Sequence, residues 1–84
     1  MKLISASWLD NGKAAQRSFP TLKEAVEFSR DRAKSPSCGP VALWRYEAKS
    51  PAALLLMQAH DGSKWWDERL YVGCVLKNGK FTSR

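Results

Sequence analysis

The residues of this sequence that are best suited to binding a ligand are basic. Arg30, Arg32 and Lys34 follow one another at alternate positions near the end of an expected helix. Cations at that place stabilise the helix dipole, so a structural role is sufficient to account for them. With other cations they could form one positive surface that binds phosphates or acidic side chains. The set is Lys13, Arg17, Arg30, Arg32 and Lys34, to which Lys23 can be added.

A second candidate is the run Lys64-Trp65-Trp66-Asp67. Neighbouring residues of a strand point to opposite faces, so one tryptophan can be core while the other is exposed. An exposed tryptophan beside Lys64 and Arg69 could stack on a base or anchor a protein interface. The alternative is that both rings pack, one on each face of a sheet. The sequence leaves open which ring is exposed.

No group of residues has the spacing of a catalytic or metal site. His60, Asp61 and Ser63 belong to one expected hairpin, where a nucleophile, a base and an orienting acid seldom converge. The two cysteines, Cys38 and Cys74, lie far apart and the chain has a single histidine, which argues against structural zinc. There is no glycine-rich phosphate loop. We therefore expect a protein that is not an enzyme and that has no metal or cofactor.

The basic residues depend on one expected helix, from residue 21 to about residue 33. Thr21 is a good N-cap, and Glu24 follows three residues later, which is the spacing of a capping box. Apolar and small residues recur behind them at helical spacing, so one side of the helix must be buried. That side comprises Leu22, Ala25, Val26, Ser29 and Ala33, with Phe28 beside them.

Strands are expected on both sides of this helix. Residues 2–9 and 14–19 form a hairpin whose Asn11-Gly12 turn needs positive φ. Ile4, Ala6 and Trp8 share one face of its first strand. After a loop over residues 34–40, strands are expected at 41–47, 53–60 and 69–77. The strand at 53–60 is the most apolar and is expected near the centre of the sheet. The tail, residues 80–84, either pairs as an edge strand or frays.

These elements predict one fold class. The hairpin-length connections imply antiparallel pairing. We predict a single α+β domain over residues 1–84, in the order ββαβββ. Its sheet is antiparallel, five-stranded and curved, with one helix packed on one face. The length of 84 residues fits one small domain.

The composition favours an acidic partner. The net charge is +6, which suits nucleic acid or an acidic protein surface, although it also suits a soluble surface with spare lysines. The longest apolar run, residues 52–57, is too short to cross a bilayer, and no secretory signal is present at the start. We expect two free thiols in a cytoplasm, with a disulfide between them as the alternative.

Residues 21–67 contain a helix of this phase and a short loop with Cys38-Gly39. A strand with Arg45-Tyr46-Glu47 and an expected Asp61-Gly62-Ser63-Lys64-Trp65 hairpin follow in order. In these features the stretch resembles the small type I anti-CRISPR proteins made by bacteriophages. The resemblance implies a compact antiparallel sheet with a single helix. It also implies an inhibitor that binds the CRISPR surveillance complex and blocks target DNA. Many such inhibitors are acidic DNA mimics, whereas this chain is basic.

The leading hypothesis is therefore a small, basic, non-catalytic phage protein of the host cytoplasm that inhibits a type I CRISPR–Cas complex. The alternative is a stand-alone nucleic-acid-binding module that uses its basic face and exposed aromatics. In either case no membrane partner is expected, and both a monomer and a homodimer formed through a sheet edge stay open. The residues expected to bind the partner are Lys13, Arg17, Arg30, Arg32, Lys34, Lys64, Trp65 and Arg69.

Overall fold

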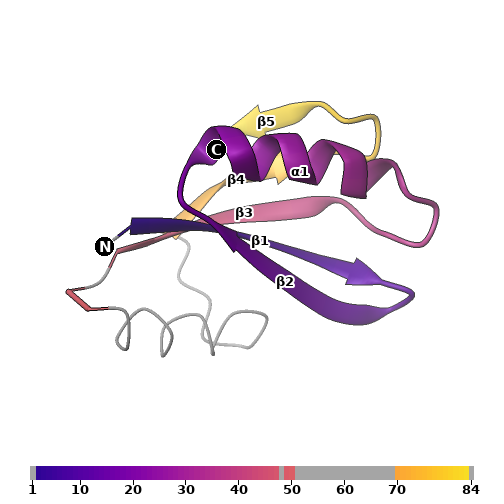
Figure 1. Ribbon diagram of the computed structural model, residues 1–84. Helices are drawn as coiled ribbons and strands as arrows, with labels where there is room; N and C mark the ends of the chain where they lie inside the picture. Colours follow the sequence, from indigo (N-terminus) through magenta and orange to yellow (C-terminus); the bar gives the residue numbers. More distant parts are fainter. Residues whose placement is uncertain (1, 48, 51–69, 84) are drawn as a thin grey trace.

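The computed structural model describes residues 2–47, 49–50 and 70–83 of the chain. Within them one helix lies on a five-stranded antiparallel sheet of order β2-β1-β3-β4-β5 (Figure 1). The predicted α+β class and the ββαβββ order are confirmed. The elements are β1 (Lys2–Asp10), β2 (Lys13–Phe19), α1 (Leu22–Lys34), β3 (Val41–Glu47), β4 (Tyr71–Val75) and β5 (Phe81–Ser83).

The first hairpin forms because its turn residues accept a left-handed backbone. Asn11 has φ of 51° and Gly12 has φ of 79°, the conformation that an Asn-Gly turn favours. The turn sets a register in which Asp10 faces Lys13 and Ile4 faces Phe19. Each of the two strands extends one residue further into the turn than the sequence predicts.

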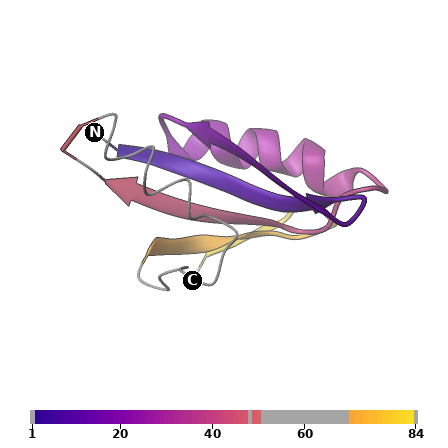
Figure 2. The same ribbon diagram turned by 90° about the horizontal axis from the view of Figure 1, so that it is seen from below.

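The helix begins at its predicted cap. The Thr21 hydroxyl oxygen accepts a hydrogen bond from the Glu24 backbone N–H at 3.3 Å, which satisfies one of the free donors of the first turn. The helix ends at Lys34, and the N–H of Ser35 bonds to the carbonyl of Arg32 at 3.1 Å. In the view from below, α1 lies along one face of the sheet (Figure 2).

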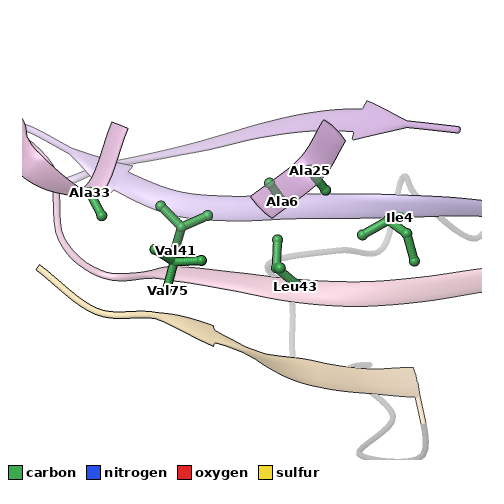
Figure 3. Packing of buried hydrophobic residues seen from close by; sticks show 7 residues of the cluster. All are labelled: Ile4, Ala6, Ala25, Ala33, Val41, Leu43 and Val75. Atoms are coloured by element: carbon green, nitrogen blue, oxygen red, sulfur yellow. The ribbon is translucent and has the colours of Figure 1, made fainter. Parts of the chain in front are cut away.

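Small side chains bring the helix close to the sheet. Ala25 and Ala33 of α1, both fully buried, face Ala6 of β1 and the aliphatic residues of the central strands (Figure 3). Close packing without bulky side chains at these positions favours a short distance between helix and sheet. The core cluster comprises Ile4, Ala6, Ala25, Ala33, Val41, Leu43 and Val75. Ile4, Ala6 and Trp8 share one face of β1, as the alternation predicts, and this face meets the helix, because Trp8 packs against the same cluster.

The opposite face of the sheet carries a second apolar cluster around β3. Trp44 and Tyr46 are both buried there, and the half-buried Tyr71 packs at a tilt against Trp44, with 5.0 Å between ring centroids. The indole N–H of Trp44 donates to the hydroxyl of Ser7 at 3.0 Å. The alternation of β3 thus supplies both faces of the sheet with core residues.

The last two strands, β4 and β5, correspond to the predicted strand at 69–77 and to the predicted tail. The strand predicted at 69–77 is observed over the five residues of β4, and the tail pairs as the edge strand β5 instead of fraying. β3 is the middle strand of the described sheet, with β1 and β4 on its two sides. The strand predicted at 53–60, and its central position, lie outside the described residues.

Candidate anion-binding surface

The phase of α1 separates the basic residues that the sequence places together. Successive residues of an α-helix are about 100° apart, so Arg30 and Arg32 lie on opposite flanks of α1. The Nε of Arg30 donates to the carbonyl of Gly79 at 3.2 Å, beside the β4–β5 turn. The Lys34 side chain also reaches Gly79. Arg32 lies on the other flank, over the rings of Trp8 and Phe28. Because Phe28 contacts Phe19 of β2, we call this side of the helix the β2 flank.

On the β2 flank, two arginines lie over three aromatic rings, and we name this group the arginine–aromatic cluster. The guanidinium carbon of Arg17 is 5.2 Å from the ring centroid of Phe28 and 5.5 Å from that of Phe19. The guanidinium carbon of Arg32 is 5.3 Å from the centroid of Phe28 and 5.5 Å from that of Trp8. Both guanidinium groups therefore lie over the Phe28 ring. The members of the cluster are Trp8, Arg17, Phe19, Phe28 and Arg32.

Short-range periodicities bring the members of the cluster to one place. Arg17 and Phe19 are two residues apart in β2 and so share the face that the helix covers. Phe28 and Arg32 are four residues apart in α1 and so lie on one flank. The rings themselves are in contact, because the Phe28 centroid is 5.5 Å from that of Trp8 and 5.0 Å from that of Phe19.

The charges of the cluster are not neutralised within the described part of the chain. There, the one ion pair joins the exposed side chains of Lys2 and Glu47 at 3.9 Å. No described carboxylate lies within ion-pair distance of Arg17 or Arg32. Each guanidinium is held over the aromatic face, an interaction that stabilises it by about 0.5–1 kcal/mol at an exposed site. Its N–H donors can still bind an anion, because contact with a ring face does not use them.

The cations of the other flank and of the β4–β5 turn contact backbone oxygens. Lys77 Nζ donates to the carbonyls of Ser35, at 2.7 Å, and of Cys38. It thereby fastens the loop after the helix to the β4–β5 turn. Arg30 makes the bond to Gly79 described above, so part of its hydrogen-bonding capacity is used within the fold. These contacts favour a structural role on this flank.

The remaining predicted residues fall into two groups. Lys13 is exposed at the start of β2 and, by alternation, shares the face of Arg17. Lys64, Trp65 and Arg69 lie outside the described residues. The structure therefore places Arg17 and Arg32 together and separates both from Arg30 and Lys34.

The sequence does not predict the three aromatic members of the cluster as site residues. It places Trp8 on one face of the first strand, Phe28 beside the buried side of the helix, and Phe19 at the end of the second strand. The available signal was a pair of spacings: arginine two residues before phenylalanine in a strand, and arginine four residues after phenylalanine in a helix. All three rings are only partly buried, so they contribute to the surface as well as to the core.

Other kinds of site have little support in the described residues. They contain no group of three His, Cys, Asp or Glu side chains that could hold a metal ion. Cys38 and Cys74 are free thiols, and burial raises the pKa of the Cys74 thiol, which makes it less reactive. In the described ranges no helix has the length and apolar content that crossing a membrane would need. Comparisons with protein-family models, with curated proteins and with solved structures find no match to this chain.

Proposed function

We propose that this protein is a non-catalytic binding protein that recognises an anionic partner through the arginine–aromatic cluster. The observation that carries the proposal is that Arg17 and Arg32 converge on one ring with no described carboxylate to neutralise them. The chain as a whole carries a net charge of +6, which favours encounter with a negatively charged surface.

The position of the two guanidinium groups over the rings supports this function energetically. An arginine side chain that is free in solution loses rotamer freedom when it binds, and each immobilised side chain costs about 0.5–1.5 kcal/mol. Arg17 and Arg32 are already restrained by the rings beneath them. A planar guanidinium also offers paired N–H donors that match a phosphate or a carboxylate. The cluster is therefore preorganised for two such contacts.

A pair of matched variants tests the proposal. R17Q/R32Q and R30Q/K34Q each remove two positive charges, but from opposite flanks of α1. We expect R17Q/R32Q to abolish binding to a fluorescent oligonucleotide or to an Asp/Glu-rich peptide, while R30Q/K34Q retains most of it. Binding of the unmodified protein should weaken as salt rises. If the unmodified protein binds neither probe, the proposal is wrong, and circular dichroism of each variant controls for folding.

We propose inhibition of a type I CRISPR–Cas complex as the specific form of this function, on the basis of the resemblance in residues 21–67. A tagged pull-down from cells with such a complex, with and without nuclease, tests this form. Cas subunits that remain bound after nuclease treatment would support a direct protein inhibitor. Nucleic acid that is lost on nuclease treatment, with no Cas subunits, would contradict it and favour a nucleic-acid-binding module.

A further inference from the structure

We infer that the ligand of the arginine–aromatic cluster is single-stranded nucleic acid, with a base stacked on a guanidinium that itself lies on a ring. This inference rests on the proposed recognition of an anionic partner, which it specifies, and it is independent of the CRISPR–Cas form of that proposal. A guanidinium between an aromatic ring and solvent presents a planar cationic surface. Nucleic-acid bases stack on such arginine planes and on exposed aromatic rings.

The geometry gives the cluster two kinds of contact at once. Phe28 has Arg17 at 5.2 Å and Arg32 at 5.3 Å from its centroid. The planar groups can take base faces, while the N–H edges of the same guanidinium groups can donate to phosphate oxygens. The partly exposed rings of Trp8 and Phe19 continue the apolar surface on either side of Phe28. A single strand offers both unstacked bases and phosphates.

The direction of β2 fits an extended ligand. β2 is the outermost strand of the described sheet next to this flank. Lys13 and Arg17 lie on one face of it, four residues and therefore about 13 Å apart. A backbone that follows β2 from Lys13 to Arg17 would pass the level of Ala15, which pairs with Trp8, the ring under Arg32. An acidic peptide or a duplex could also bind these cations through its carboxylates or phosphates. However, a peptide has few planar groups that can stack, and the bases of a duplex are already stacked on one another.

The test compares four probes of equal charge with the full chain. They are a single-stranded oligonucleotide of about twelve nucleotides, the same oligonucleotide without bases, a duplex and a glutamate-rich peptide. We expect the intact single strand to bind at least about tenfold more tightly than the abasic strand, since each stacked base contributes roughly that factor. The duplex and the peptide should bind no better than the abasic strand.

A charge-conserving variant shows whether the guanidinium planes cause the preference for the intact strand over the abasic strand. R17K/R32K keeps the net charge but removes both guanidinium planes. We expect it to bind the intact and abasic strands almost equally, while its affinity for the abasic strand changes little. R30K, on the opposite flank, should keep the full preference for bases. Thermal melts of the variants establish that each is folded at the assay temperature.

The outcomes separate this inference from the proposed function. Equal binding of intact and abasic strands by the unmodified protein would overturn the inference, although an anionic ligand would stand. Tighter binding of the glutamate-rich peptide or of the duplex would likewise overturn it and identify a different partner. Equal loss of base preference in R30K and R17K/R32K would show that the cluster is not the site. If none of the probes binds, the proposed function is wrong as well.

Discussion

The pairing of β4 with β5 depends on the absence of a side chain at Gly73. A Cβ added there would lie 2.5 Å from the carbonyl oxygen of Thr82 and 2.9 Å from the Cα of Ser83. It would also lie 2.9 Å from Cε1 of Phe81. Two of these three atoms belong to the backbone and cannot rotate away. Gly73→Ala must therefore displace β5 or break its pairing with β4.

The size of the stability loss in Gly73→Ala can be estimated from the kind of clash. Overpacking of this type costs about 1–3 kcal/mol, and a domain of this size loses about 4–8 °C of melting temperature per kcal/mol. We therefore expect Gly73→Ala to lower the melting temperature by about 4 °C or more. Because a total stability of about 5–15 kcal/mol is typical, the variant should still fold.

A matched control uses Gly39, which has no atom within 4 Å of an added Cβ. Its N–H donates to the carbonyl of Leu9 at 3.0 Å, and alanine keeps that donor. Gly39→Ala should therefore melt close to the unmodified protein. Circular dichroism measures the melts, and hydrogen exchange measures local opening of β5. Unchanged melting together with unchanged exchange in β5 of Gly73→Ala would refute the reasoning.

Three further predictions concern the helix and the ionisable groups of β4. Thr21→Ala should lower stability by about 1 kcal/mol in urea titrations because it removes the cap, whereas Thr21→Ser should not. Ser29→Ala should be neutral or slightly stabilising in the same assay, since the bond from the Ser29 hydroxyl to the Ala25 carbonyl duplicates a helical acceptor; a loss above about 1 kcal/mol would contradict this. Burial raises the pKa of the Cys74 thiol. Burial also raises the pKa of the Tyr71 hydroxyl, and the nearby Cys74 thiolate raises it further. Both groups keep protons in the folded state that the unfolded chain loses, so stability should fall as pH rises above about 9, and less steeply in Cys74→Ala.

Much of the fold follows from local signals in the sequence. Asn11-Gly12 requires a turn because both residues adopt positive φ, and Thr21 marks the start of the helix because its hydroxyl replaces a missing acceptor. The alternation correctly places Ile4, Ala6 and Trp8 on one face of β1. Such signals act over a few residues, so they can be read without knowledge of the partners in space.

The pairing of the tail could not be decided locally. Residues 81–83 are too few to specify a strand on their own, and β5 forms because Gly73 allows their backbone to approach β4. The β-bulge at β4, where Leu43 faces Gly73 but Trp44 faces Tyr71, likewise depends on contacts between strands far apart in sequence.

Composition and periodicity alone predict the net positive charge, the helix α1 and the buried side of that helix. Which cations act together depends instead on how α1 packs on the sheet. Arg30 and Arg32 are two residues apart in the chain, but the docking of α1 directs one towards Gly79 and the other towards Trp8 of β1. The same docking brings Arg17 to Phe28. The physical reason is that the buried stripe of Ala25, Ser29 and Ala33 fixes the rotation of the helix on the sheet.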